Sequence, residues 1–372
     1  MKRIRLAVSA VLATVGLLAA VAAAAASATP ASSSPPSTGP DTEACLACHA
    51  APGQTTTLPS GEPLYISIDG AVFDASVHGQ EQLACADCHP GNAAFPHPPV
   101  TAHTRREYVL QRYQACATCH QDKYQATLDS VHQRALAGGN LEAAVCTDCH
   151  GAHDVQPIAE APRSAIPQTC ERCHSAIFAV YRDSVHGAAL IGEGNPDVPS
   201  CIDCHGVHNV QGPSTGPFHL FSPTICARCH ADPELMAKYG LSTEILETYV
   251  SDFHGTTVLL FEKVAPDQQT NKPVCTDCHG VHDIRRTDDP ESTVLKQNLL
   301  ATCRRCHPDA TADFPAAWLG HYPPDPQHAP LVYYVNLFYR ILIPVTIGGM
   351  AVFVVSDAVR RAVRRRREAR HD

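Results

Sequence analysis

The sequence lacks the signatures of several common protein classes. It contains no phosphate-binding loop, no GxGxxG turn between a strand and a helix, and no Ser, His and Asp arrangement of a hydrolase. Basic residues are scarce, because residues 29–330 hold 17 Lys and Arg against 34 Asp and Glu, a difference of −17. This negative net charge repels nucleic acid and favours basic partners or cations. We therefore expect no catalytic residues of these types and no nucleic-acid partner.

The sequence also has no cysteine outside one repeated motif. All 18 cysteines belong to nine C-x-x-C-H motifs, the attachment signature of c-type haem. Each thiol adds to a vinyl group on the porphyrin, and the histidine that follows binds the iron from one face. We predict nine covalently bound c-type haems. The cysteines are Cys45, Cys48, Cys85, Cys88, Cys116, Cys119, Cys146, Cys149, Cys170, Cys173, Cys201, Cys204, Cys226, Cys229, Cys275, Cys278, Cys303 and Cys306, and the proximal histidines are His49, His89, His120, His150, His174, His205, His230, His279 and His307.

Two other uses of cysteine fit this pattern less well. A zinc ribbon joins two C-x-x-C pairs around one metal and does not need a histidine directly after each pair. A secreted disulfide scaffold uses an even number of cysteines but has no reason to place His after every second one. The motif histidines therefore favour haem.

The N-terminus carries an export signal. Residues 1–28 combine a basic start, an apolar run and an A-S-A site, which predict a cleaved secretory signal peptide. Residues 29–44 form a Pro/Ser-rich linker. Residues 45–330 are then the exported nine-haem domain, in agreement with haem attachment outside the cytoplasm.

The C-terminus predicts a membrane anchor. Residues 331–358 include about 20 mostly apolar residues, enough to cross a bilayer. Tyr333, Tyr334 and Tyr339 suit an interfacial aromatic belt, and the arginine-rich residues 359–372 predict a cytoplasmic tail. We expect a single-pass protein of the cell membrane whose haem domain faces the periplasm.

A two-haem unit repeats along the exported domain. Residues 116–155, 170–210 and 226–284 each hold one motif, then a histidine in an S-V-H-G-like segment, then a second motif. A looser copy covers residues 45–89. We call these copies units 1 to 4 in chain order, and residues 45–89 are unit 1. The ninth motif, at Cys303–His307, follows unit 4.

These doubled motifs, the repeated S-V-H-G and the repeated C-H-G-x-H resemble the periplasmic multihaem cytochromes c with class III-like haem packing. The resemblance covers about residues 45–330. It implies mostly bis-histidine, low-potential haems and an electron-transfer role. The expected fold is mainly α and irregular: short helices and loops around a haem array, little or no sheet, and one C-terminal transmembrane helix. With so few residues per porphyrin, we expect no folding without haem.

The second axial position of each iron needs another donor. Outside the signal and membrane segments, Met236 is the only methionine, whereas thirteen of the 22 histidines lie outside the motifs. The proposed distal ligands are His78, His103, His132, His153, His186, His208, His254, His282 and His321, with His97 as the alternative to His103. His219 and His328 are expected to be bystanders.

The spacing predicts that these histidines serve other haems. Three residues are too short a tether to reach the far face of the same porphyrin, and twelve helical residues span about 18 Å. We expect His78, His132, His186 and His254 to face His89, His150, His205 and His279. We expect His153, His208 and His282 to face His120, His174 and His230. His103 or His97 would serve the first haem and His321 the ninth.

Three functions remain open on sequence alone. The first is an anchored electron conduit between an integral-membrane quinol-oxidising or b-type cytochrome partner and exported redox acceptors or donors. The second is a multihaem reductase of a small oxyanion such as nitrite or tetrathionate. The third is a structural or filament cytochrome. Sufficient histidine for nine irons, and the membrane helix, favour the conduit.

Overall fold

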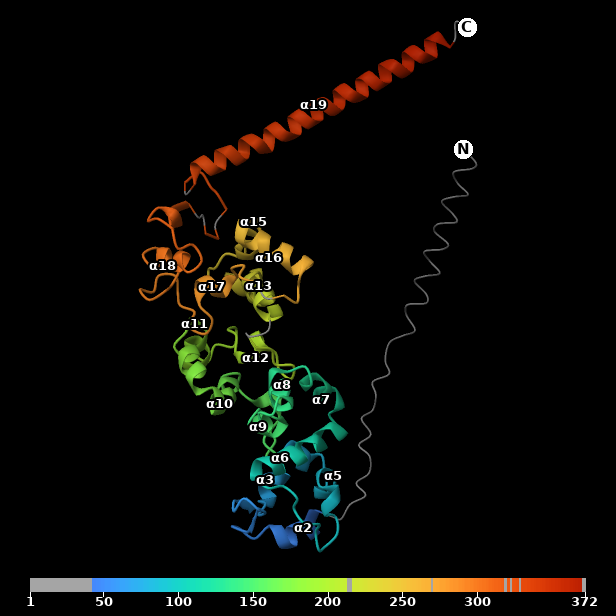
Figure 1. The fold of residues 1–372 in the computed structure, drawn as a ribbon, viewed down its shortest axis with the longest axis vertical. Coiled ribbons are helices and arrows are strands. Elements are labelled where there is room, and N and C mark those ends of the chain that lie inside the picture. Colours follow the sequence, from blue (N-terminus) through green and yellow to red (C-terminus); the bar gives the residue numbers. More distant parts are fainter. Residues whose placement is uncertain are drawn as a thin grey trace.

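The computed structural model describes residues 42–212, 216–268, 270–317, 320–321, 323–327 and 329–369. The expected signal peptide, most of the linker and His328 lie outside the described residues. Between α2 (Thr42–His49) and α19 (Pro330–Glu368) the molecule is elongated, and the units follow one another along the long axis in sequence order (Figure 1). Unit 1 and α19 therefore lie at opposite ends.

The helices that precede α19 are short. Between the first and last helices the structure contains α3 (Gly70–Asp74), α4 (Val77–Gln80), α5 (Cys85–Cys88), η1 (Pro90–Asn92), α6 (Arg105–Arg112), η2 (Tyr113–Thr118), α7 (Gln121–Thr127), α8 (Val131–Ala137), α9 (Cys146–His150), η3 (Ile158–Glu160), α10 (Ala165–Arg182), α11 (Val185–Gly187), η4 (Ala188–Gly192), α12 (Cys201–His205), α13 (Gly216–His230), α14 (Pro233–Ala237), α15 (Ile245–Ser251), α16 (Phe253–Val264), α17 (Cys275–His279), α18 (Leu299–Arg304) and η5 (Phe314–Ala317).

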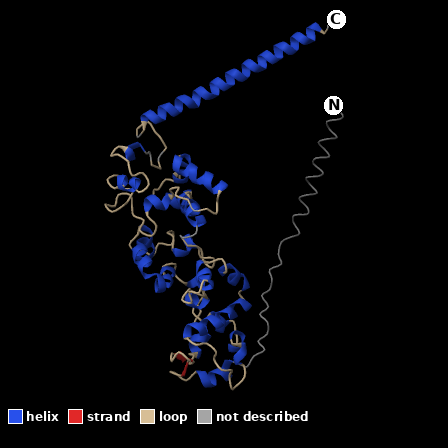
Figure 2. Cartoon of the chain, in the orientation of Figure 1, coloured by secondary structure: helices blue, strands red, loops and turns tan. Residues whose placement is uncertain are grey.

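The mainly helical fold class is confirmed. Within the described residues the only sheet is an antiparallel pair, β1 (Thr55–Thr57) and β2 (Pro63–Tyr65), in which Thr56 pairs with Leu64 (Figure 2). This hairpin lies in unit 1. Elsewhere, loops join the helices.

Packed side chains form only a small core. Among the described residues, one cluster of fully buried apolar side chains is present, Leu220, Val258 and Val274, against which Tyr249 and Phe261 pack. Other buried apolar residues, such as Leu58 and Leu190, are scattered along the chain. A chain of this size normally buries a much larger continuous apolar core. Packed apolar side chains therefore account for little of the stability expected of the described residues before α19.

The last helix is long, apolar and fully exposed. Within α19, residues Pro330–Arg367 have a window of mean hydropathy 1.9 with none of it buried. Figure 1 shows α19 projecting away from the units. By length and composition, this helix fits a single membrane span.

Candidate haem-binding site

Nine pairs of histidine rings face each other along the molecule. In every pair one ring belongs to a C-x-x-C-H motif and the other does not, and each motif histidine is used once. The ring centroids are 6.0–6.3 Å apart in all nine pairs. The pairs are His49–His97, His89–His153, His120–His78, His150–His208, His174–His132, His205–His282, His230–His186, His279–His321 and His307–His254.

This spacing fits a haem iron between the two rings. An imidazole nitrogen lies about 2.0–2.1 Å from a metal that it binds. Two such bonds in line, together with the distance from each nitrogen to its ring centre, separate the centroids by about 6 Å. Packed apolar side chains are few along the part of the chain that carries the pairs. The residues present therefore fit nine bis-histidine c-type haems, which supply one-electron redox chemistry when bound.

The S-V-H-G segments are built as capped turns. In units 1 to 3 the buried hydroxyls of Ser76, Ser130 and Ser184 accept a hydrogen bond from the N–H three residues later, at 3.0–3.1 Å. Asp252 takes this N-cap position in unit 4. The cap starts a short helix whose first turn carries the distal histidine, so its position is fixed relative to the preceding helix.

Glycine in this segment permits a close backbone approach. A Cβ at Gly187 would collide with the carbonyl oxygen of Tyr181, and a Cβ at Gly255 would collide with that of Tyr249. The same holds for Gly79 and Phe73. The tight turn brings the histidine before each glycine close to the helix that precedes the cap.

The C-H-G-x-H segments depend on a left-handed glycine. Gly151, Gly206 and Gly280 follow their motif histidines with φ of 76°, 81° and 83°. A Cβ at Gly206 would also lie 2.8 Å from Asn209 Oδ1. Because L-residues rarely adopt this conformation, glycine turns the chain here and presents the next histidine to a different ring.

Successive units interlock through these two segments. The N–H of Val77 donates to the carbonyl of Val155 at 2.9 Å, and Val131 donates to Val210 at 2.8 Å. Val185 bonds Ile284 in the same way at 2.8 Å. Each bond joins the S-V-H-G segment of one unit to the segment after C-H-G-x-H in the next unit.

The histidine pairs follow the same rule. The S-V-H-G histidine of one unit faces the first motif of the next unit, as His132 faces His174. In return, the C-H-G-x-H histidine of that next unit faces the second motif of the preceding unit, as His208 faces His150. Each junction between units therefore holds two reciprocal histidine pairs and one main-chain hydrogen bond.

This rule corrects the pairing expected from sequence. The expected exchange between haems is present, but the partners differ by one motif. His78, His132, His186 and His254 face His120, His174, His230 and His307, not the second motif of their own unit. His153, His208 and His282 face His89, His150 and His205. The physical reason is that both segments reach across the unit boundary.

The ends of the array follow a different pattern. His97 lies opposite His49 at 6.0 Å, whereas the exposed His103 has no ring opposite it among the described residues, so His97 and not His103 is the ring paired with the first motif. At the other end His321 faces His279 of the eighth motif, not His307 of the ninth. His97 stands where no preceding unit supplies an S-V-H-G histidine. His321 stands where no following unit supplies a C-H-G-x-H histidine.

A carboxylate holds the second motif of each unit in place. In each of these motifs an Asp side chain accepts a 2.7 Å hydrogen bond from the N–H three residues before it. Arg106 pairs with both oxygens of Asp148 at 2.9 and 3.0 Å, and Arg163 pairs with Asp203 at 2.7 Å. In unit 4 the partner is a histidine, because His219 Nε2 lies 3.1 Å from Asp277 Oδ2. His219 is thus a positioning residue and no ring-pair member.

Burial keeps several of the paired imidazoles neutral. Desolvation, with a smaller effect of His230, lowers the pKa of His186 to about 4. Desolvation and the facing ring also lower the pKa of His132 and His279. A neutral imidazole is the form that binds a metal. These rings are therefore in the ligand-competent state at neutral pH.

The attachment cysteines form an unbroken series. The first thiols of adjacent motifs lie within hydrogen-bonding reach at Cys116–Cys146, Cys170–Cys201 and Cys226–Cys275. The remaining junctions place the second cysteine of one motif near both cysteines of the next, at Cys88, Cys149, Cys204 and Cys278. Cys85 Sγ lies 4.0 Å from Thr42 Oγ1 on α2, which connects the first two motifs. Motif order along the chain is therefore spatial order.

The arrangement does not resemble the alternative uses of cysteine. All 18 cysteines are free of disulfides. Across the described residues, no group of three or more Cys, His, Asp or Glu side chains is arranged to hold a metal ion. A tetrahedral zinc site requires such a group. The structure instead offers pairs of imidazoles beside pairs of thiols.

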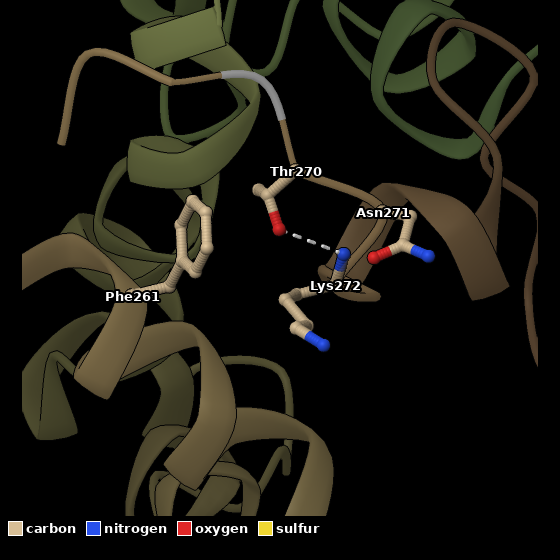
Figure 3. A pocket seen from close by; sticks show the side chains of 4 residues that line it. All are labelled: Phe261, Thr270, Asn271 and Lys272. Carbon is tan, nitrogen blue, oxygen red and sulfur yellow. Dashed lines mark hydrogen bonds between the residues drawn. The ribbon is translucent and has the colours of Figure 1, made fainter. Parts of the chain in front are cut away.

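A surface pocket in unit 4 offers no other chemistry. Phe261, Thr270, Asn271 and Lys272 line it, and Thr270 Oγ1 accepts a 3.1 Å hydrogen bond from the N–H of Lys272 (Figure 3). The pocket has neither a paired acid and base nor an activated nucleophile. The histidine array is therefore the candidate functional site.

Comparison with known families agrees with this geometry. Residues 69–138 match the family model of cytochrome c552. The matched segment includes the second and third motifs and the histidine pair His78–His120. This similarity indicates a multihaem c-type cytochrome that carries covalently bound haem and acts in electron transfer. A c-type cytochrome is typically extracytoplasmic, and α19 fits a single membrane span.

Proposed function

We propose that this protein is a membrane-anchored nonahaem cytochrome c that conducts electrons between a membrane partner and exported redox proteins. The observation that carries the proposal is the set of nine histidine pairs in sequence order along the long axis. From the second motif to the ninth, the cysteines of each motif lie near those of the next. Cys85 of the second motif lies beside Thr42 on the helix of the first. An electron entering at one end therefore has a series of closely spaced acceptors. The residues of this chain hold, space and bury those acceptors.

The same pairs favour a conduit over a reductase. Reduction of a small oxyanion at a haem requires an iron with an open coordination position. Each of the nine motif histidines instead has an imidazole opposite it at 6.0–6.3 Å. Two strong ligands per iron suit outer-sphere electron transfer.

The ninth motif is the proposed port at the membrane. Its pair, His254–His307, precedes α19, and Phe314 packs on His307 with ring centroids 5.1 Å apart. A single helix cannot enclose a quinone, so the partner is an integral-membrane quinol-oxidising or b-type cytochrome subunit that packs on α19. The apolar face around Pro344–Gly349 suits close helix packing, because Gly348 and Gly349 have open space at their Cβ positions.

Haem content gives the first test. The intact mass of the mature protein should exceed that of the cleaved polypeptide by nine haem masses. The oxidised protein should show only low-spin bis-histidine signals in electron paramagnetic resonance. A smaller mass increment, or a high-spin signal of one haem equivalent, would contradict the proposal.

Removal of residues 331–372 tests the membrane port. The shortened protein should be soluble, retain all nine haems and accept electrons from dithionite. It should lose reduction by quinol in membranes that contain the partner. The control is full-length protein in the same membranes. Equal quinol-driven rates for both forms would show that electrons do not enter at the anchored end.

A further inference from the structure

Unit 1 differs from the rest of the molecule in charge. Residues 41–104 contain seven acidic side chains and neither lysine nor arginine. Residues 105–164, which include unit 2, hold six basic and seven acidic side chains. Residues 105–330 as a whole hold 17 basic and 27 acidic side chains, so the acidic stretch that lacks any basic residue lies at the end of the molecule farthest from α19 (Figure 1).

The acidic residues surround the first histidine pair. Glu43 lies on α2, which ends at His49, and Asp69 and Asp74 cap and end α3. These helices touch, because a Cβ on Gly70 would lie 3.0 Å from Leu46, and the N–H of Ile68 donates to the carbonyl of His49 at 2.8 Å. Asp69 and Asp74 are exposed.

An exposed apolar centre lies beside the same pair. Phe95 is 88 % exposed and stands edge-on to His97 with ring centroids 6.0 Å apart. Tyr65, in β2, is 64 % exposed, and Val72, in α3, is 43 % exposed. A solvent-facing aromatic at the redox centre within an acidic surround has the composition of a docking surface, which combines an apolar centre and a charged rim.

The position in the array gives this surface a role. The first pair is completed by His97, from the segment that follows unit 1, so the first haem site has one neighbouring site in the series instead of two. It is the free terminus of the array, opposite the membrane helix. An electron that travels the whole series must enter or leave here.

We propose that unit 1 is the docking surface for a soluble redox protein with a lysine-rich face. This inference rests on the proposed function, which it deepens by naming the class of partner. Acidic side chains steer the cationic face, and Phe95 makes the apolar contact nearest to the first haem site. In each productive encounter one electron would pass from the reduced array to the one-electron acceptor of the partner, so that the array is oxidised and the partner is reduced by one electron. An anionic lipid surface is disfavoured by the same charge.

The test measures binding and electron transfer separately. Full-length protein in non-ionic detergent is titrated with a lysine-rich monohaem cytochrome c, and the dissociation constant is measured by calorimetry at 10 and 200 mM salt. The variant D69N/D74N/E81Q neutralises three exposed acids of unit 1. The matched control, E234Q/E247Q/D267N, neutralises three exposed acids of unit 4, one in α14, one in α15 and one after α16.

We expect the original protein to bind the probe less tightly at 200 mM than at 10 mM salt. At 10 mM salt the unit 1 variant should bind about tenfold more weakly than the original protein, because it lacks three of the acidic charges that attract the probe. The unit 4 variant should bind like the original protein. Phe95→Ala should slow electron transfer to the probe with little change in its salt dependence. Equal weakening by both charge variants, or equally tight binding of a lysine-acetylated probe, would overturn the docking surface.

The electron-transfer measurement distinguishes a failure of the docking surface from a failure of the proposed function. The reduced protein is mixed with the lysine-rich probe, with the acetylated probe and with ferricyanide. Fast oxidation by all reagents, without preference for the lysine-rich probe, would overturn only the docking surface. Failure of every reagent to oxidise the reduced protein would overturn the electron conduit itself, whatever the binding constants.

Discussion

The interior and the ends of the array obey different rules. Between units 1 and 4 every junction is reciprocal, so each unit gives one histidine forward and receives one back, as at His186–His230 and His205–His282. At the N-terminal end, His97, which follows unit 1, faces the first motif of that same unit. Repeat proteins require atypical terminal repeats for the same reason, since the last unit has no neighbour to complete it. The non-motif histidines of the interior thus join neighbouring units, whereas His97 at the end only completes a pair.

The largest effect should come from preventing haem attachment. Among the described residues before α19, the small cluster around Val258 is the packed core that the side chains form by themselves. We expect this part of the protein to be unfolded and rapidly proteolysed in cells that lack haem attachment, whereas α19 should still insert in the membrane. Circular dichroism and limited proteolysis measure this difference. A protease-resistant apo domain would show that the polypeptide packs by itself.

Ligand removal should separate the interior from the end. His186→Ala and His97→Ala should each convert one low-spin haem to high-spin. His186→Ala also removes a histidine pair that joins two units. We therefore expect it to lower the free energy of unfolding by roughly 2–4 kcal/mol, and His97→Ala to lower it clearly less. Optical spectra and chemical denaturation give the two readouts. An unchanged spectrum for either variant would reject that histidine as a ligand.

The close glycine contact should matter in unit 3 but not in unit 2. Gly187→Ala places a Cβ against the carbonyl of Tyr181, and we expect a loss of about 2–3 kcal/mol. Gln133 occupies the equivalent position in unit 2, so its Cβ is already accommodated. Gln133→Ala should change stability by less than about 0.5 kcal/mol. Denaturant melts of both variants test this contrast, and equal effects would refute it.

Acid should weaken the interior junctions. The pKa of His186 is lowered to about 4 in the folded protein, so the unfolded chain binds the proton more readily. Stability is therefore complete above pH 6.5 and decreases as the pH falls toward 4. Binding of the His186 imidazole to iron would also oppose its protonation in the folded protein, so stability would again decrease toward low pH. Melting temperatures between pH 8 and pH 4 should decrease on the acid side, and a rise below pH 6 would contradict this assignment.

The smallest effects are expected at the partners of the Asp side chains in the second motif of each unit. Arg106 bonds Asp148 and also donates to the carbonyls of Leu141 and Ala143, whereas His219 makes one bond to Asp277. Arg106→His should cost about 1–2 kcal/mol because carbonyls lose donors. His219→Arg should change stability by less than about 1 kcal/mol. Thermal melts of the two variants, with identical haem spectra, check this difference.

The sequence was a good guide to the composition of the site but not to its pairing. The repeated S-V-H-G and C-H-G-x-H segments identified seven of the nine non-motif partners, and His321 was also chosen correctly as a ring-pair member. His97 and His103 could not be separated by spacing alone, because either follows the second motif. The absent C-H-G-x-H in unit 1, where Pro90 follows His89, was the signal that its spare histidine lies elsewhere.

The amino-acid sequence by itself determined the nine motifs, the helical class, the abundance of histidine and the apolar C-terminal segment, because spacing and composition are local properties. Only the tertiary structure decided which imidazole faces which. That choice depends on main-chain bonds such as Val131–Val210, which join residues 79 positions apart and move each histidine across a unit boundary. It also depends on glycines at φ near 80°, which turn the chain after the motif. Contacts between distant segments leave no trace in the spacing of either segment alone.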